Sequence, residues 1–307
     1  MKIKKYILSW LLMFVSVAAF AGVGQWRTHF AYNSVQVIAN CPEEIYALAN
    51  GAIFSINKMT ENMTLYNNRS GLHGTNVCFL MYDEEREQLL IMYSDGKMDI
   101  QYNGTMHYIS DLYNKRMTSS KKCNNITIHG KFAYLSMDFG ILVFDLEKHE
   151  FKETYYIGEE ASEVQVTDVM FYGDSIYART KSKNYSACIY DNVVDYHFWS
   201  TCPVLPCPFD TKKGKEYTML NGDLWKVAGA QGVYRKFVTG EEAYYLPDGP
   251  YVNTPYSMTF DRGRLYVVPG GRWANQNGTE GHVMIYENKK WLNITNAQIK
   301  GQTGKRA

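Results

Sequence analysis

The residue types best suited to catalysis are scattered along this sequence and form no recognisable motif. The seven histidines include no HExxH motif and no pair at metal-ligand spacing beside Asp or Glu. No GxSxG motif marks a nucleophilic serine, and no cysteine lies in an identifiable Cys–His context. We therefore expect a protein that is not an enzyme, with no catalytic residues, no metal site and no cofactor.

Carboxylates are the next chemistry to consider, because glycoside hydrolases use a pair of them. Asp95 and Asp138 both lie in turns with a nearby glycine, where an aspartate commonly serves to form the turn. Asp boxes of the form SxDxGxTW, typical of sialidases, are absent, and Ser94-Asp95-Gly96 is only a fragment of one. A glycan-active enzyme is thus the least favoured alternative.

The best candidate for a binding loop is Gly270-Gly271-Arg272-Trp273. Adjacent glycines allow positive φ or a close backbone approach, and Arg and Trp often anchor interfaces. The alternative is an internal Arg–Trp stack that only pins the surrounding loop. We take these four residues as the candidate binding site.

The six cysteines show no zinc-binding pattern, because there is no CxxC and no accompanying pair of histidines. Cys202 and Cys207 bracket a short Pro-containing stretch and could form a local disulfide. Cys78 and Cys188 lie in apolar strands, where a buried free thiol is equally plausible.

The N-terminus has the organisation of a secretory signal peptide. Lys2, Lys4 and Lys5 precede an uncharged apolar run, and Ala19-Phe20-Ala21 supplies a small-x-small cleavage site. The run is shorter than the roughly 20 apolar residues that a membrane span needs. We expect a signal peptide over residues 1–21, one all-β domain over 22–295 and a disordered tail over 296–307.

One sequence phrase returns six times along the chain: a short apolar strand followed by a turn and a second apolar strand. Its central residues recur with a period in the low forties, which is typical of β-propeller blades of four strands. The phrases are Ile45-Tyr46-Ala47, Leu90-Ile91-Met92, Ala133-Tyr134-Leu135, Ile176-Tyr177-Ala178, Leu224-Trp225-Lys226 and Leu265-Tyr266-Val267. We predict an all-β propeller with six blades and no substantial helix after the signal peptide.

The two ends of this array do not match. Gln25-Trp26-Arg27-Thr28 resembles the outer strand Lys290-Trp291-Leu292-Asn293 but has no blade of its own. This pattern predicts an N-terminal outer strand of a seventh blade and an incomplete, truncated ring. The first and the sixth blade should then each expose an apolar face.

The charge of the chain gives no argument for nucleic acid, because the formal net charge is only +1. Tyrosine is abundant, with 25 residues against 14 phenylalanines. Tyrosine suits half-buried strands, where its ring packs and its hydroxyl reaches water.

Several segments resemble known propeller families. Ser70-Gly71-Leu72, the strand after it and Asp95-Gly96 are similar to the two-component regulator propeller repeat. The opening segment 24–33, Phe139-Gly140-Ile141 and the Gly270–Asn275 loop resemble the PorZ-like family of Bacteroidota type IX secretion.

The resemblance implies an exported, non-enzymatic propeller at the bacterial outer membrane, peripheral to it, whose loops bind secretion-system proteins or surface glycan. Members of the PorZ-like family, which this chain resembles, have two propellers and a C-terminal sorting domain. The alternative is the extracytoplasmic ligand-sensing propeller of a hybrid two-component receptor.

Overall fold

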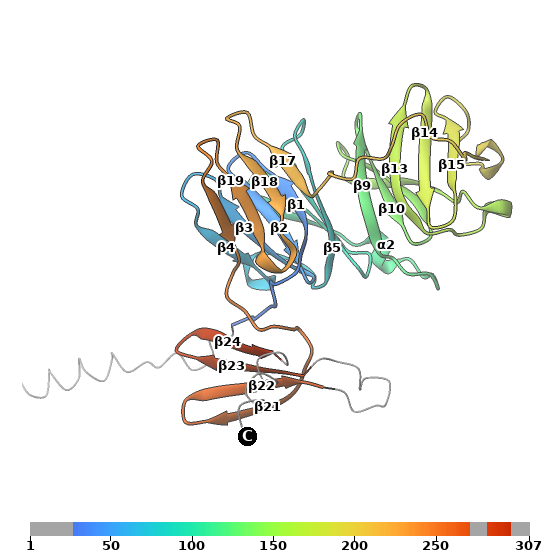
Figure 1. Cartoon of the computed structure of the whole chain (residues 1–307). Helices are drawn as coiled ribbons and strands as arrows, with labels where there is room; N and C mark the ends of the chain where they lie inside the picture. The colour runs from blue at the N-terminus through green and yellow to red at the C-terminus, as the bar shows by residue number, and fades with distance from the viewer. Residues whose placement is uncertain (1–26, 271–280, 296–307) are drawn as a thin grey trace, which may run out of the picture.

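The computed structural model describes residues 27–270 and 281–295, which form six four-stranded antiparallel sheets (Figure 1). In every sheet the strands follow one another in sequence order, as in propeller blades. Each of the six repeated phrases lies in the second strand of its sheet. The predicted fold class is therefore confirmed.

The first three sheets span residues 35–155. Their strands are β1 (Val35–Asn40), β2 (Glu44–Ala49), β3 (Ala52–Asn57) and β4 (Met63–Tyr66), then β5 (Val77–Asp83), β6 (Gln88–Tyr93), β7 (Met98–Tyr102) and β8 (Thr105–Ile109), then β9 (Cys123–His129), β10 (Phe132–Met137), β11 (Gly140–Asp145) and β12 (Glu150–Tyr155).

The last three sheets follow at a similar period. Their strands are β13 (Val166–Tyr172), β14 (Ser175–Thr180), β15 (Asn184–Cys188) and β16 (Ser200–Thr201), then β17 (Glu216–Thr218), β18 (Leu224–Val227), β19 (Val233–Lys236) and β20 (Glu242–Tyr245), then β21 (Pro255–Asp261), β22 (Arg264–Pro269), β23 (His282–Glu287) and β24 (Lys290–Thr295).

Helical elements within 27–270 and 281–295 are single turns, as the lack of helical periodicity predicted. They are the 3₁₀ helices η1 (Asn68–Ser70), η2 (Glu159–Ala161), η3 (Tyr196–Phe198) and η4 (Gly229–Gln231), and the α-helix α2 (Asp111–Asn114). No helix in these ranges is long and apolar enough to cross a membrane.

A β-bulge recurs at the second residue of the first strand in five of the six sheets. The extra residue bends the strand and redirects its side chain. The bulged residues are Gln36, Cys78, Asn124, Thr167 and Tyr256. In the third sheet the bulge lets Asn124 donate to the Val166 carbonyl of the fourth sheet at 2.9 Å. In the third sheet the bulge therefore also links two neighbouring sheets.

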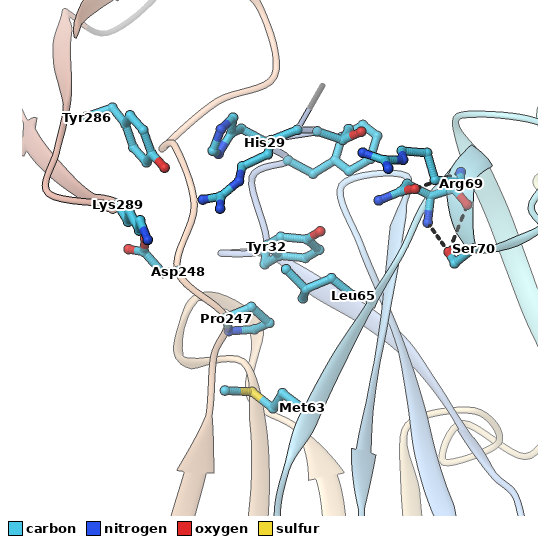
Figure 2. A pocket seen from close by; sticks show the side chains of 14 residues that line it. His29, Tyr32, Met63, Leu65, Arg69, Ser70, Pro247, Asp248, Tyr286 and Lys289 are labelled. Atoms are coloured by element: carbon cyan, nitrogen blue, oxygen red, sulfur yellow. Dashed lines mark hydrogen bonds between the residues drawn. The ribbon is translucent and has the colours of Figure 1, made fainter. Parts of the chain in front are cut away.

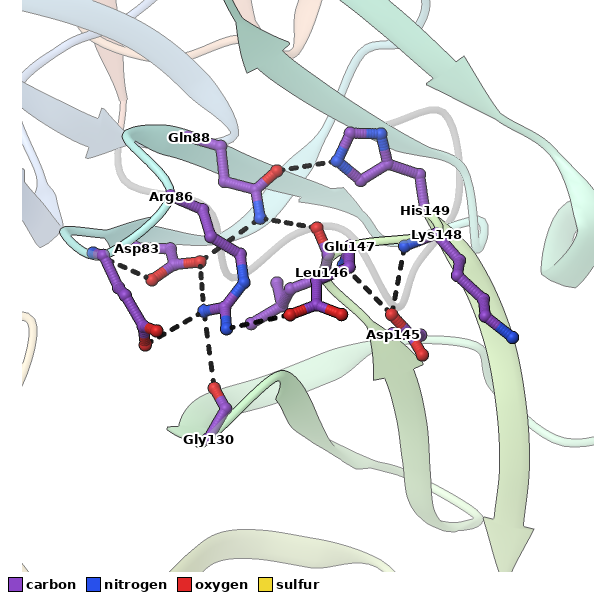
Figure 3. Close-up of polar contacts among 10 residues, drawn as sticks. Asp83, Arg86, Gln88, Gly130, Asp145, Leu146, Glu147, Lys148 and His149 are labelled. Atoms are coloured by element: carbon purple, nitrogen blue, oxygen red, sulfur yellow. Dashed lines mark hydrogen bonds and ion pairs between the residues drawn. The ribbon is translucent and has the colours of Figure 1, made fainter.

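A polar cluster ties the second sheet to the third (Figure 3). The Arg86 guanidinium contacts Asp83 at 3.3 Å and reaches across to the Gly130 carbonyl at 3.4 Å. Gln88 is fully buried; its amide donates to the Leu146 carbonyl at 3.0 Å. These contacts satisfy buried polar groups that would otherwise be costly.

The fifth sheet packs against the first, beside which it lies in Figure 1. Trp225, Val233 and Tyr245 share one buried cluster with Ile38 and Phe54 of the first sheet. The prediction that the first blade exposes an apolar face is therefore wrong. Apolar strand patterns do not specify which other sheet covers them, and here the chain returns to supply the cover.

The return path is the segment between β16 and β17, which runs back past β9 in Figure 1. The Ile38 backbone N–H donates to the Gly214 carbonyl at 2.7 Å. Gly214 has φ +68°, and a Cβ there would lie 3.2 Å from Val37 Cγ1. Glycine is therefore the residue that fits this crossing.

The sixth sheet lies apart from the other five (Figure 1). Two segments, here called connectors, link it to them: residues 246–254 lead from β20 to β21, and residues 27–34 precede β1 and contact the sixth sheet through His29. Ala31 N–H donates to Asn253 Oδ1 at 2.6 Å, and Asn33 Nδ2 donates to the Tyr251 carbonyl at 3.0 Å. The connectors therefore run bonded to each other. All seven residues of β21 are exposed, which agrees with the predicted bare face on this sheet.

The predicted orphan strand lies only partly in the described chain. Gln25 and Trp26 are outside it, and Arg27 and Thr28 are in no strand. The signal peptide over 1–21 and the tail over 296–307 lie outside the described residues, so those predictions stand as they were.

Candidate functional site

A cleft of about 720 Å³ lies where the sixth sheet meets the first. Figure 2 shows Tyr286, Lys289 and Asp248 on one side and Arg69 and Ser70 on the other. The walls are the two connectors, β4, η1 and the β23–β24 hairpin. The lining residues are Arg27, Thr28, His29, Phe30, Tyr32, Met63, Leu65, Asn67, Arg69, Ser70, Pro247, Asp248, Tyr286 and Lys289.

A capped 3₁₀ turn positions the η1 wall. Asn67 is the N-cap: its side chain accepts from Arg69 N–H at 2.8 Å, and its own N–H donates to Ser70 Oγ at 2.7 Å. This reciprocal pair is a capping box. Gly71 ends the turn with φ 100°, a conformation that favours glycine. Arg69 is thereby held at the cleft.

Aromatic contacts hold the opposite wall. The His29 ring lies edge-on to Tyr286 at 4.8 Å and to Trp291 at 5.4 Å. Trp291 Nε1–H donates to His29 Nδ1 at 3.1 Å, and the Trp291 backbone N–H donates to both oxygens of Asp248 at 3.1 and 3.2 Å. These bonds fix the β23–β24 hairpin against both connectors.

The electrostatics of the cleft favour an anion. Three lining side chains are cationic, Arg27, Arg69 and Lys289, against the single carboxylate of Asp248. Burial and the neighbouring Arg27 lower the pKa of His29, although Asp248 opposes them. His29 is therefore neutral at pH 7, which suits an Nδ1 that accepts a hydrogen bond.

The floor of the cleft is apolar. Tyr32 is buried, lies edge-on to Phe54 at 5.7 Å and has its pKa raised to about 12 by burial. Met63 and Leu65 of β4 are 42% and 41% exposed. The cleft thus combines an apolar floor with a cationic rim, which suits an anionic partner that also has apolar groups.

The predicted binding loop is mostly outside the described residues. Gly271, Arg272 and Trp273 lie there, and only Gly270 is described, directly after β22. A Cβ on Gly270 would lie 3.3 Å from the Tyr256 ring. A close approach to its own sheet therefore explains this glycine, and the proposed binding role of the loop stays a prediction.

Cys202 and Cys207 are free thiols in this structure. The Cys202 thiol donates to the Val204 carbonyl at 3.0 Å, and Cys207 Sγ lies 3.9 Å from Met170 Sδ. A disulfide between Cys202 and Cys207 remains a prediction.

The two turn aspartates are bound to groups of their own sheets or their neighbours. Asp95 pairs with Lys97 at 2.9 Å. Burial alone would raise the pKa of Asp138, but hydrogen bonds, with Asn124 and Gln165 among the donors, lower it overall. A glycosidase acid needs a raised pKa, so Asp138 is unsuited to that role.

One His–Asp pair was not identified from the sequence. His73 Nδ1 bonds Asp99 Oδ1 at 2.9 Å, and the His73 N–H donates to Asp99 Oδ2 at 2.8 Å. Tyr93 OH also donates to Asp99 at 2.5 Å, and the His73 ring stacks on Tyr108 at 4.8 Å. In the described ranges no hydroxyl or thiol bonds the His73 ring, so the pair anchors the segment before β5.

Groups of three or more His, Cys, Asp or Glu that could hold a metal ion do not occur among the described residues. The cleft was not found from the sequence because its residues come from five separate segments and form no motif. The one local signal was the Asn67–Ser70 capping box followed by Gly71.

Comparison with known proteins gives the family. The model of the type IX secretion-system PorZ N-terminal β-propeller domain matches residues 45–200. The structure is similar to that of PorZ, an essential bacterial surface component of the type IX secretion system of Porphyromonas gingivalis, at 20% identity and a TM-score of 0.73. That alignment covers 91% of this chain and 47% of PorZ, so the chain spans about half the length of that protein.

A weaker similarity exists to the extracellular domain of a putative hybrid two-component system from B. thetaiotaomicron. It has 12% identity and a TM-score of 0.45, over 84% of this chain and 34% of that one. No curated protein matches the chain. The family match covers more than half of the sequence and the fold agrees with it, so this chain belongs to the PorZ N-terminal β-propeller domain family of the type IX secretion system.

Proposed function

We propose that this chain is an exported, non-enzymatic propeller scaffold of the type IX secretion system that holds an anionic protein or glycan partner at the outer membrane. The observation that carries the proposal is the cationic cleft between η1 and the sixth sheet, in a chain that belongs to the PorZ propeller family. Rigid sheets position the loops, and the loops make the contacts.

The side chains of the cleft support binding rather than catalysis. Its cations lie at the rim, and the neutral His29 already accepts a hydrogen bond from Trp291. Asp248, its only carboxylate, accepts two contacts from the Trp291 backbone. Cations at an open rim attract an anionic partner and orient it on approach.

Location is the first part to test. We expect cleavage after Ala21, so that the mature chain begins at Gly22 and lies outside the cytoplasm. Mass spectrometry of cell-envelope fractions should find Gly22 as the N-terminus, and protease added to intact cells should degrade the protein. An intact Met1 in those fractions would overturn the export step.

Function is tested by deletion and complementation in the host bacterium. Deletion should abolish the appearance of type IX cargo at the cell surface, and the wild-type gene should restore it. The double variant Arg27→Gln/Lys289→Gln, which removes two rim cations, should fail to restore it. The control Lys148→Gln/Lys212→Gln removes two exposed lysines outside the cleft and should restore it fully.

Two outcomes would refute different parts of the proposed function. Normal cargo export after deletion would refute the secretion role. Full restoration by the cleft variant would leave the secretion role standing and refute the cleft as the binding site.

A further inference from the structure

A second cavity lies away from the cleft, on the inner side of the third and fourth sheets. It has a volume of about 280 Å³ and is bounded by β9, β13 and the returning segment before β17. Lys213 of that segment is part of its lining. Nothing in the proposed function of the cleft uses this cavity.

The position of Lys213 is fixed by its own side chain and by the backbone of the next residue. Its Nζ donates to Thr127 Oγ1 of β9 at 2.6 Å. The next residue, Gly214, is held by the hydrogen bond from Ile38 N–H at 2.7 Å. The side-chain bond to Thr127 and the backbone bond at Gly214 together hold Lys213 at the cavity.

The Lys213 ammonium is partly buried and has few hydrogen-bond partners. Burial lowers its pKa to about 8, even though Asp168 and Asp210 favour the charged form. Within the described ranges Thr127 Oγ1 is its one hydrogen-bond acceptor, and that hydroxyl itself donates to the Val169 carbonyl at 2.7 Å. An ammonium has three donors, so two N–H groups are left for another acceptor.

The nearest buried carboxylate is already occupied. Asp168 Oδ1 accepts from Asn125 at 2.8 Å and from the Val169 backbone at 2.9 Å, and its Oδ2 pairs with Arg179 at 3.2 Å. Arg179 in turn stacks over the Phe209 ring at 4.7 Å. Asp168 is thus compensated by Arg179, and among the described residues no carboxylate lies within ion-pair distance of the Lys213 ammonium.

The rest of the cavity wall is largely apolar. Phe209 is buried over it, and Met170 and Ile128 contribute aliphatic surface. Phe171 is stacked flat on His129, with ring centroids 4.0 Å apart and planes at 8°. A cation beside aromatic and aliphatic surface suits a ligand with one anionic end and an apolar body.

We propose that this cavity binds a small monocarboxylate with an aromatic or aliphatic body, whose carboxylate accepts the free N–H groups of Lys213. A carboxylate offers the two oxygens that the ammonium lacks. A dianion is disfavoured because Asp168 and Asp210 border the cavity. A neutral amide cannot compensate the partly buried charge of Lys213.

The test uses phenylacetate as the probe and the full chain as the protein. Calorimetric titration should show phenylacetate binding at millimolar concentrations, with much weaker binding of the neutral phenylacetamide and of the dianionic phenyl phosphate. Lys213→Met should weaken phenylacetate binding by roughly tenfold or more. The control Lys215→Met, at an exposed lysine two residues further on, should leave it unchanged.

A pH series on the wild-type protein tests the same contact without any variant. Raising the pH from about 7 to about 9 removes the Lys213 proton and should weaken phenylacetate binding. The other ionisable groups facing Lys213 are Asp168 on β13, Arg179 on β14, Cys123 and His129 on β9, and Asp210 in its own segment.

Deprotonation of Cys123 in the same interval would only add to the loss of phenylacetate binding. Burial raises the pKa of Cys123 far above this interval.

Equal binding of phenylacetate and phenylacetamide, unchanged binding by Lys213→Met, or no phenylacetate binding by the wild-type chain would each overturn the proposal. If Lys213→Met fails to fold, the pH series decides: binding that does not change between the two pH values overturns it.

Discussion

The second and sixth sheets begin with strands of the same length and the same irregularity. β5 and β21 each have seven residues, with a bulge at the second one and a hairpin to the next strand. Leu80 of β5 pairs with Ile91 and is fully buried. Met258 occupies the same position in β21, pairs with Val267 and is 63% exposed.

This comparison separates what a strand needs from what a core needs. Pairing, bulge and hairpin arise within one repeat, so both sheets have them. Burial requires a second sheet, and β5 has β1 and β9 as neighbours, while β21 is exposed along its whole length. The five packed sheets should therefore contribute most of the free energy of unfolding. Matched substitutions in the packed sheets and in the sixth sheet should change this free energy by clearly different amounts.

The largest difference should come from the arginines. Arg235 lies between Trp225 and Phe237, bonds Asp223 at 2.6 Å and reaches the Lys58 carbonyl of the first sheet at 3.0 Å. Arg235→Met would leave the buried Asp223 without compensation, so we expect a loss of about 3–5 kcal/mol in unfolding free energy. Urea unfolding at neutral pH measures it.

The matched control is Arg264→Met in the sixth sheet. Arg264 pairs with Glu287 at 2.9 Å, but the two side chains are 49% and 39% exposed. An exposed pair contributes under about 1 kcal/mol. Equal losses of unfolding free energy in the two variants would contradict the view that Arg235 holds the fifth sheet against the first.

The next difference should come from two apolar residues at equivalent positions. Leu80→Ala removes a fully buried side chain and should cost about 2–5 kcal/mol, because it leaves a cavity between packed sheets. Met258→Ala removes an exposed one and should cost under about 1 kcal/mol. A large loss from Met258→Ala in the same urea experiment would show that β21 is covered in solution.

The same contrast explains how far the sequence could predict the structure. The six repeated phrases located every sheet, because strand pairing is encoded locally in apolar runs and turns. The position of the fifth sheet beside the first could not be predicted, because Trp225 and Tyr245 are equally suitable for packing on any sheet. The bulge at Cys78 or Asn124 leaves no residue signature either.

The candidate sites show the same limit. The cleft brings His29 together with Asp248 and Lys289, more than 200 residues away in the chain, so no spacing rule reveals it. Lys213 lies in a polar stretch with Lys212 and Lys215, and no residue pattern distinguishes it from these neighbours. Its burial depends on the return of the chain across β9, which the repeat pattern does not contain.

Two ionisable groups allow pH to act on the two regions separately, and alkaline pH acts on the packed sheets. Burial lowers the pKa of Lys213 from 10.5 to about 8. Between these values the unfolded chain binds more protons than the folded one, so stability rises with pH across this window. The full shift corresponds to roughly 3 kcal/mol.

Lys213→Met removes this contribution, while the other alkaline titrations are common to both proteins. The difference in unfolding free energy between wild type and variant should therefore change by roughly 3 kcal/mol between about pH 8 and 10.5, in favour of the wild type at the higher pH. Urea unfolding at a series of pH values measures it. Parallel stability curves for the two proteins would contradict a buried, charged Lys213 at neutral pH.

The smallest effect on stability should come from acid pH, which weakens the contacts of His29 with the sixth sheet. His29 has its pKa lowered from 6.5 by burial and by Arg27. As the pH falls below about 6.5, an undocked His29 takes up a proton before the docked one, so docking weakens through this window. Protonation also removes the acceptor for the Trp291 indole N–H.

The indole resonance of Trp291, assigned by its loss in Trp291→Phe, reports this bond directly. It should shift with a midpoint below 6.5 and lose this transition in His29→Phe, while Lys213→Met should leave it unaltered. Because docking removes His29 from water only in part, the change in global stability should be small even where the resonance moves clearly. A midpoint above 6.5 would mean that His29 is held in its charged form. Its attraction to Asp248, rather than the aromatic contacts, would then stabilise the docking of the sixth sheet.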